Sequence, residues 1–543
     1  MKYTFTLLIV LFFSLNASAQ NQQLENSPAR NSRGNIQTIT ANIPYQGYDE
    51  SQAYFGQGEY QVFLDTGDGI LDQPIFIIGG FDPGDSQDIP GLYNRLSFNG
   101  VNLADTLRDE GYDIVIVNSP QYTTGGKFID GGADYIQRNG LVLAAILEEI
   151  NAQKVGDAQN VVIGTSMGGL VSQYALAYME ANSLPHETRL FISFDAPHRG
   201  ANIPISLQYL LNYLAEQTGD PTAQQLISGA LSSPAAKEML VDHLQAHLLP
   251  GSNYLQDPTK LLPEGAPNFR EAFQTEMDAL GFPQNVRNVA MINGSGIGTT
   301  IGTPGMEVVN TNLEVDANTD IDVALYFTSV ASETLTVTDV TVNFFNFPID
   351  SFTADAQSTA LSDGVDSAPG GRGNISAALS GGGGNPVLQD FIDALQQDSY
   401  SFIPTLSSLA IEADNWFALP NLNDSPFVNY HIPDTNQNHV TVTAENLQFA
   451  LDEIRQVLGV EENTSASIVL LQNPVEGEIR IGLSQSSETV TTELYSITGG
   501  LIAQKEWNQP GNVLRWTQNL SSGMYVLSVL NGTQNQQFKV IVK

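Results

Sequence analysis

One serine in this sequence has the surroundings of a catalytic nucleophile. Residues 161–170 read VVIGTSMGGL, so an apolar strand pattern passes through G-x-S-x-G, centred on Ser166, into a helical pattern. Glycines on either side of a serine let the strand and the helix approach closely, and the tight turn between them exposes the hydroxyl. The amides and dipole of the following helix favour negative charge beside that hydroxyl. A phosphate-binding turn is the alternative, but the lysine and second spacing of a P-loop are missing.

Acyl transfer at such a serine needs two backbone amides that stabilise an oxyanion. The residue after the nucleophile, Met167, offers the first amide. The apolar strand pattern at 74–78 ends in Gly79-Gly80-Phe81-Asp82, where glycine lets the chain turn over the edge of a sheet and offers the amide of Phe81. A tight turn without a catalytic role is the alternative for that second segment.

The general base must be a histidine that follows the nucleophile and the acid in chain order, on a loop before the last helix. His439 fits best, because it directly precedes a helix start at Thr443 and an apolar stripe over 447–458. His431, in the same loop, is the alternative base. The sequence contains six histidines: His186, His198, His243, His247, His431 and His439.

The acid is predicted from the ends of the strands. Asp195 follows the apolar run 190–194, at the carboxyl edge of a sheet where catalytic residues collect. The next strand pattern, 288–292, is followed by Asn293 and has no carboxylate. Asp195 is therefore favoured, with Asp414 and Asp398 as alternatives; Asp195 could instead only orient the turn after it. A Ser-His-Asp triad of this kind works without a cofactor.

Two further histidines are candidate metal ligands. His243 and His247 are four residues apart, a spacing that could present two ligands on one helical face. No acidic third ligand accompanies them in an HExxH pattern, so the sequence predicts surface positions on a helix and no metal site. The chain has no cysteine, which excludes a thiol nucleophile and a Cys-ligated metal.

The elements that must position these residues alternate between strand and helix. Short apolar runs predict four buried strands and a helix between the second and third, and hence a mostly parallel sheet flanked by helices. The predicted catalytic domain covers 43–462 and includes a helical cap at about 203–285, a β insertion at about 308–350 and a mobile glycine-rich loop at about 362–385. The four strands are 75–78, 114–117, 161–164 and 190–194.

Four segments of this domain carry a family resemblance: IIGGFDP, GTSMGGL, SFDAPHRGANIPI and NQNHVTVTAENLQFALDEI. They resemble secreted bacterial α/β-hydrolases of the lipase and esterase kind, over roughly residues 60–460. The resemblance implies the α/β-hydrolase fold, hydrolysis of ester or lipid-like substrates through a Ser-acid-His triad, and a supporting role for His198 in its PHRG turn. A serine peptidase or thioesterase would share the triad, and a catalytically inactive surface binding protein is an alternative of another class.

The two ends of the chain predict export. Lys2, the apolar run 7–15 and Ala17-Ser18-Ala19 predict a signal peptide at 1–19. The run is too short for a membrane anchor, which was the alternative. Residues 20–42 are polar and are predicted to be flexible. The acidic balance, 59 Asp and Glu against 21 Lys and Arg, disfavours nucleic acid as a partner.

The last part of the chain, 465–543, has the short alternating runs of a small β-sandwich. Its segments LLQNPV, LSSGMYVL and FKVIVK resemble the type A sorting domain of the bacterial type IX secretion system. That resemblance implies contact with the secretion machinery, passage through the periplasm, and release or attachment at the cell surface. A sandwich that binds carbohydrate or mediates adhesion, with Trp507 and Trp516 as binding residues, is the alternative.

Overall fold

The computed structural model describes 35–218, 221–379 and 386–455 and, in the C-terminal part, 468–470, 475, 477–483, 489–496, 499–509, 513–532 and 534–542. The predicted signal peptide lies outside these residues. The chain divides into two compact units, Met1–Gln456 and Val457–Lys543, which are considered separately. Among the described residues, no helix combines the length and the apolar character needed to cross a bilayer.

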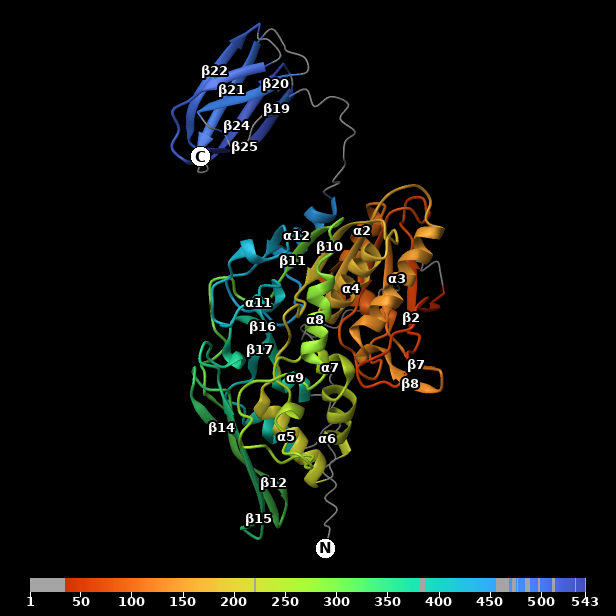
Figure 1. The fold of residues 1–543 in the computed structure, drawn as a ribbon, viewed down its shortest axis with the longest axis vertical. Coiled ribbons are helices and arrows are strands. Elements are labelled where there is room, and N and C mark those ends of the chain that lie inside the picture. Colours follow the sequence, from red (N-terminus) through yellow and green to blue (C-terminus); the bar gives the residue numbers. More distant parts are fainter. Residues whose placement is uncertain are drawn as a thin grey trace. The chain divides into compact units, whose positions relative to one another are not determined.

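An eight-stranded sheet forms the centre of the first unit (Figure 1). Its first two neighbour pairs are antiparallel, and the six strands from β6 to β18 run parallel. In spatial order the strands are β1 (Gln37–Thr40), β2 (Gln57–Phe63), β6 (Asp113–Asn118), β3 (Pro74–Ile78), β9 (Asn160–Thr165), β10 (Thr188–Phe194), β11 (Arg287–Met291) and β18 (Asn429–His431).

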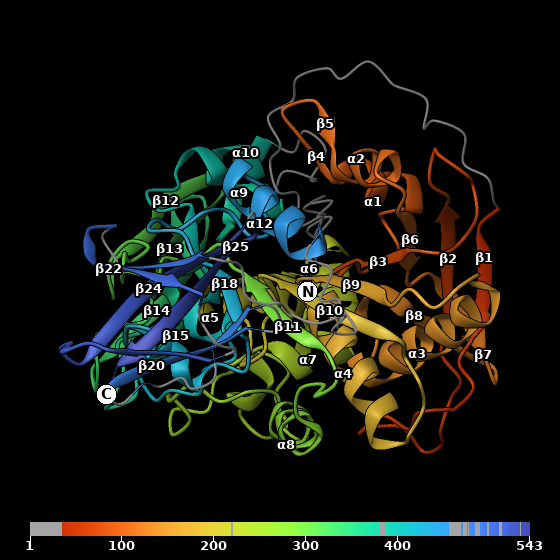
Figure 2. The ribbon, with the colours of Figure 1, turned by 90° about the horizontal axis from the view of Figure 1, so that it is seen from above.

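Helices cover both faces of this sheet, so its central strands are buried on both sides and read as continuous apolar runs. Alternate residues of the strands face two separate cores. Phe76, Val115 and Val162 pack with α3 (Ile136–Gln153) and α4 (Met167–Ala181). Ile75 and Ile77 face the opposite core, together with α1 (Ile89–Arg95), α2 (Leu103–Asp109) and α12 (Ala444–Arg455). Figure 2, seen from above, shows α1, α2 and α12 on one side of the sheet and α3 and α4 on the other.

This arrangement is the α/β-hydrolase fold, as predicted. The sheet is mostly parallel, has helices on both faces, and carries a serine on the strand-to-helix turn between β9 and α4. The four predicted strands correspond to β3, β6, β9 and β10. Strand β1 lies within the segment that is predicted to be flexible. The sequence does not indicate this strand, because it is a short, mostly exposed edge strand without an apolar periodicity.

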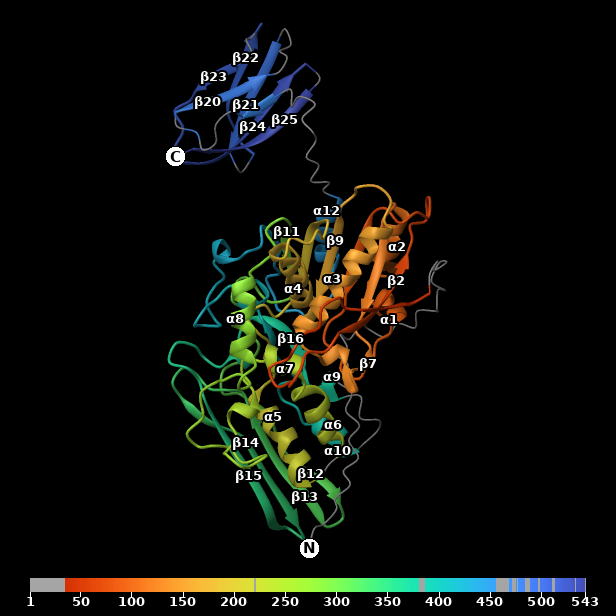
Figure 3. The ribbon, with the colours of Figure 1, turned by 45° about the vertical axis from the view of Figure 1, so that its right-hand side comes forward.

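The described residues between β10 and β11 form four α-helices, and two of them are followed by π-helical turns. The helix nearest to β11, α8, packs on α4, with Tyr174 bonded to Glu276, and so connects two strands of the sheet instead of covering the site. The remaining three lie beyond the lower end of the sheet in Figure 3. The helices are α5 (Ile205–Tyr213), α6 (Pro221–Leu226), α7 (Pro234–Met239) and α8 (Arg270–Leu280).

The β insertion is a four-stranded antiparallel meander that continues to residue 357, seven residues beyond the predicted end. Its strands are β12 (Glu307–Asp316), β13 (Thr319–Tyr326), β14 (Thr334–Phe344) and β15 (Phe347–Gln357). The meander packs against α5, where the rings of Tyr213 and Phe352 stack with centroids 5.2 Å apart. The insertion is therefore packed on the helical segment between β10 and β11.

The prediction of a mobile loop at 362–385 is wrong in part. Gly370–Asn374 forms strand β16, which pairs antiparallel with β17 (Ser399–Pro404). Glycine is needed there for close packing and not for flexibility, because a Cβ on Gly370 would lie 2.4 Å from Ser401 Oγ. The glycine run at 381–384 lies outside the described residues.

The second unit is the predicted β-sandwich, with two antiparallel sheets around one apolar core. Trp516 is buried in that core, and the indole of Trp507 donates to Thr492 Oγ1, which favours structural roles for both tryptophans. The sequence did not indicate β22 and β23, most of whose residues are exposed. One sheet contains β19 (Ile468–Leu470), β20 (Glu478–Leu483) and β23 (Val513–Thr517); the other contains β22 (Leu501–Asn508), β21 (Thr489–Ser496), β24 (Gly523–Asn531) and β25 (Gln534–Val542).

Candidate active site

Ser166 lies on the turn between β9 and α4 with φ 54° and ψ −128°, a conformation that residues other than glycine rarely adopt. Its amide donates to the carbonyl of Phe194 over 2.9 Å, which fixes the turn against β10. A Cβ on Gly164 would lie 2.4 Å from the carbonyl oxygen of Gly168, and one on Gly168 equally close to that of Gly79. Both glycines of the motif are therefore required by packing, and the strain is held at the serine itself.

The structure brings Ser166, His439 and Asp195 together in one hydrogen-bonded chain. His439 Nε2 lies 2.8 Å from Ser166 Oγ, and His439 Nδ1 lies 2.7 Å from Asp195 Oδ2. A carboxylate only accepts hydrogen bonds, so Nδ1 carries the proton and Nε2 is free to accept from the serine hydroxyl. The three residues are 7%, 5% and 0% exposed, so little water competes for these bonds.

Asp195 is held from several directions at the end of β10. Its φ of 48° turns the chain sharply, and its amide donates to the carbonyl of Met291 over 2.8 Å. Oδ1 accepts from the amide of Asn293 at 3.1 Å and from Ser408 Oγ at 3.0 Å, so Oδ2 alone faces His439. Strand β11, which is followed by no carboxylate, thus contributes the amide of Asn293 as a donor that orients Asp195. The sequence did not indicate this contact.

Backbone hydrogen bonds join the loop that carries His439 to β16. The amide of His439 donates to the carbonyl of Arg372 over 3.0 Å, and the amide of Arg372 donates to the carbonyl of Gln437 over 2.8 Å. Asn293 Nδ2 donates to Gln437 Oε1 over 2.8 Å, and the ring of Phe402 stands edge-on to the imidazole at 4.9 Å. Sequence reasoning missed Arg372, Ser408 and Phe402, because each contacts the triad only through the tertiary fold.

The alternative base and one of the alternative acids have other partners. His431 lies on β18 with its ring 6.2 Å from that of Phe449, and burial lowers its pKa. Asp398 accepts from the amide and the hydroxyl of Ser376, at the start of α9 (Ile375–Leu379). Asp414 is exposed. The imidazole of His439 is already bonded to Asp195, so neither alternative carboxylate is its partner.

His198 lies behind the site and is fully engaged. Its Nδ1 lies 2.9 Å from Gln173 Oε1, and its Nε2 lies 2.7 Å from Ser193 Oγ. Burial lowers the pKa of His198 to about 3, so the ring stays neutral at neutral pH and ties the turn after β10 to α4. This arrangement supports the structural role that was expected of the PHRG turn.

The prediction that His243 and His247 are surface residues on a helix is wrong. His243 precedes a single 3-10 turn. Both imidazoles are buried, and each can be buried because it forms hydrogen bonds with protein groups. His243 Nε2 lies 2.8 Å from the carbonyl of Leu231, and His247 Nε2 lies 2.6 Å from Asp242 Oδ1. Within the part of the chain that the structure describes, no group of three or more candidate ligands could hold a metal.

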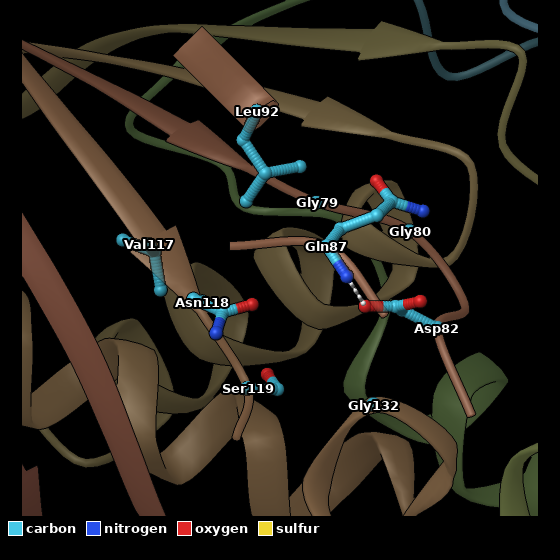
Figure 4. Close-up of a pocket in the computed structure, with 9 residues that line it drawn as sticks. All are labelled: Gly79, Gly80, Asp82, Gln87, Leu92, Val117, Asn118, Ser119 and Gly132. Atoms are coloured by element: carbon cyan, nitrogen blue, oxygen red, sulfur yellow. Dashed lines mark hydrogen bonds between the residues drawn. The ribbon is translucent and has the colours of Figure 1, made fainter. Parts of the chain in front are cut away.

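The loop after β3 lies directly against the nucleophile. A Cβ on Gly80 would be 2.9 Å from Ser166 Cβ and 3.3 Å from its Oγ, so glycine is needed where this loop passes. Asp82 anchors the loop: its amide donates to the carbonyl of Gly132 over 3.0 Å, and its carboxylate accepts from the amide of Gln87 over 2.9 Å. Figure 4 shows a pocket beside it, lined among others by Gly80, Asp82, Gln87 and Gly132.

The predicted amide donors lie on the two segments that meet at this point. Met167 is the first residue of α4, so its amide has no acceptor within the helix. Phe81 follows Gly80 in the loop and is partly buried. Both segments therefore lie beside Ser166, and the oxyanion role of the two amides stays a prediction.

Comparison with known proteins gives a family for the C-terminal unit. Residues 473–543 match the family model described as "Secretion system C-terminal sorting domain". This match agrees with the predicted sorting domain and not with a carbohydrate-binding sandwich. A comparison with curated protein sequences found no match.

Among solved structures, the matches include lipases and esterases at low similarity. The mature form of the Bacillus licheniformis lipase BlEst2 is 16% identical, with 44% of this chain and 72% of that chain covered and a TM-score of 0.24. Its propeptide form is 13% identical, with 88% and 76% covered and a TM-score of 0.31. Est1E from Butyrivibrio proteoclasticus is 13% identical, with 47% and 77% covered and a TM-score of 0.24.

Because these identities and scores are low, the fold is established by the strand order and by the turn at Ser166. The C-terminal match establishes the route of export. The chain is therefore a protein of the α/β-hydrolase fold that ends in a type IX secretion sorting domain, which directs it to the cell surface or the extracellular space.

Proposed function

We propose that this protein is an exported serine hydrolase that cleaves carboxylic esters, with lipid-like esters as its substrates. The single observation that carries the proposal is the continuous hydrogen-bonded chain from Ser166 through His439 to Asp195. A hydroxyl within 2.8 Å of a neutral imidazole nitrogen can lose its proton as it attacks a carbonyl carbon. A protein that only binds ligands has no need of this geometry.

The reaction proceeds in two halves. His439 Nε2 takes the proton from Ser166 Oγ while that oxygen attacks the ester carbonyl, and the resulting oxyanion accepts from the amides of Met167 and Phe81. When the intermediate collapses, the alcohol leaves with the proton from His439. Water then attacks the acyl-enzyme in the same way and releases the carboxylic acid, so no cofactor is consumed.

Asp195 orients the imidazole. Its Oδ2 accepts a hydrogen bond from Nδ1–H over 2.7 Å, which leaves Nε2 unprotonated and directed at Ser166. Its other oxygen is held by Asn293 and Ser408, so the carboxylate cannot rotate away without losing two further bonds. The positive charge that forms on the imidazole is stabilised by the same carboxylate.

The test is hydrolysis of p-nitrophenyl esters, from acetate to palmitate, by the mature protein and by variants. Ser166→Ala and His439→Ala should each lower kcat by about 10⁴-fold or more, because either change breaks the unit that activates the nucleophile. His431→Ala is the matched control and should retain activity, since that ring lies on β18 against Phe449. Equal turnover by Ser166→Ala, or an equal loss in His431→Ala, would contradict the proposal.

The same protein preparations distinguish the alternatives. Preference for long acyl chains would indicate a lipase and preference for short ones an esterase, whereas faster cleavage of amide or thioester analogues would indicate a peptidase or thioesterase. An organophosphonate that labels Ser166 in the wild type but not in Ser166→Ala would reject the inactive binding protein. Failure to label Ser166 would favour it.

A further inference from the structure

The turn between β14 and β15 carries a cluster of exposed apolar side chains. We call residues 343–349, with the sequence NFFNFPI, the hairpin tip. Phe347 is 72% exposed, Phe345 58%, Ile349 53% and Phe344 41%. Single exposed apolar residues are common on soluble proteins, but a contiguous cluster of them marks an interaction site.

The backbone of the hairpin tip is strained at the position that displays an aromatic ring. Phe344 pairs with Phe347, so Phe345 and Asn346 form a two-residue turn, and their φ values are 52° and 61°. Such a turn favours Asn-Gly, and a bulky residue at its first position is a rare choice. Because the ring of Phe345 is largely in solvent, burial in the monomer does not compensate this strain, which points to a functional reason for it.

The hairpin tip is fixed to the rest of the catalytic unit. The amide of Phe345 donates to the carbonyl of Asn318 over 2.7 Å, which joins the two hairpins of the meander. Thr338 Oγ1, further along β14, donates to the carbonyl of Ser206 over 3.0 Å, at the start of the cap helix α5. Figures 1 and 3 show the meander reaching the end of the unit beyond α5, on the side away from α12.

Charge and area restrict what the hairpin tip can bind. The meander, 307–357, contains nine Asp and Glu and no Lys or Arg, whereas 341–349 is uncharged. This field repels anionic surfaces but not a neutral one. At the exposures given above, the four side chains offer roughly 400 Å². A second copy of the chain would need about 800 Å² from each partner.

We propose that the hairpin tip docks on an uncharged lipid surface and inserts Phe345 and Phe347 among its headgroups. A few aromatic side chains on a rigid element suit such an interface, because apolar atoms leave water while the polar backbone of the turn stays near the headgroups. Since the meander is attached to α5, docking would hold the end of the unit that contains α5 toward the lipid. The inference goes beyond the proposed hydrolysis and does not require Ser166 to react.

The test is flotation with phosphatidylcholine vesicles, using the mature chain with Ser166→Ala so that no lipid is consumed. Phe345→Ser with Phe347→Ser should lower the vesicle partition coefficient at least tenfold. The matched control is Phe128→Ser with Leu419→Ser, which removes two apolar side chains outside the hairpin tip that are 62% and 66% exposed. It should bind as the parent does, and vesicles rich in phosphatidylglycerol should bind the parent less well.

A second variant checks the geometry without removing apolar surface. In Phe347→Trp, the emission of the new indole should shift to shorter wavelength on phosphatidylcholine and be quenched by lipids brominated near the headgroup. The proposal is overturned if the parent does not float, if the Ser variants float equally well, or if the new indole is not quenched. Self-association that is lost in the Ser variants would identify a second copy of the chain as the occupant and would also overturn it.

Discussion

The close approach of Gly371 to the acid gives a sharp test of the proposed triad. A Cβ at this position would lie 2.2 Å from Asp195 Oδ2 and 3.0 Å from its Cγ. A carbon and an oxygen that are not bonded remain more than about 3.2 Å apart, so Gly371→Ala must move the carboxylate or β16 by about 1 Å. Such a displacement near reacting groups costs about 10²-fold in rate.

Gly373→Ala is the matched control, two residues further along the same strand. Its Cβ would lie 2.4 Å from the ring of Tyr400, so it creates a comparable clash without touching the triad. Both variants should lose about 1–3 kcal/mol of unfolding free energy through overpacking. Only Gly371→Ala should also lose about 10²-fold in kcat per folded molecule.

The assay is p-nitrophenyl ester hydrolysis, normalised to the fraction folded in urea at the assay temperature. A fluorophosphonate titration of Ser166 counts the competent sites independently. If Gly371→Ala and Gly373→Ala retained the same kcat, then the contact between Gly371 and Asp195 would have no bearing on catalysis, and the assignment of Asp195 would fail with it.

Two further predictions concern stability. Burial depresses the folded-state pKa of His198 to about 3. The stabilisation of the fold by the neutral ring is therefore complete above the ordinary pKa near 6.5 and is lost as the pH falls toward 3, by up to about 5 kcal/mol. Urea denaturation between pH 7 and 4 should show a shallower pH dependence of the unfolding free energy in His198→Gln, and an unchanged slope would contradict this. Arg138 is buried between Asp134 and Glu50, and Glu50 also pairs with Lys127. Arg138→Met therefore leaves the buried Asp134 carboxylate without its cation and should cost about 3–5 kcal/mol. Removal of the exposed Lys260 should cost less than about 1 kcal/mol by the same denaturation, and equal losses would refute the distinction.

Much of the architecture could be predicted from local patterns. The continuous apolar runs at β3, β6, β9 and β10 arise because these strands are covered on both faces, and they were recognised on that basis. Edge strands such as β1 and β22 carry no such pattern, because most of their side chains remain in water.

The candidate site could be predicted only where a motif or a strand end marks it. Ser166 has a local motif, and Asp195 and His439 could be ranked by chain order and by the elements beside them. The contacts of Gly371, Ser408 and Phe402 depend on how distant segments meet, and no periodicity or spacing indicates them. The close packing of the glycines in β16 likewise depends on distant segments, so their sequence predicts a mobile loop where the structure has a strand.

The order in which the three candidate residues occur along the chain has a consequence for when activity can arise. Ser166 and Asp195 belong to the first 200 positions, whereas His439 lies in the loop between β18 and α12, close to the end of the first unit. Under the proposed mechanism, a chain whose last strand has not yet docked holds a serine without a proton acceptor. Such a chain would be inert during transit through the cell envelope, so hydrolysis would begin only after the fold has closed.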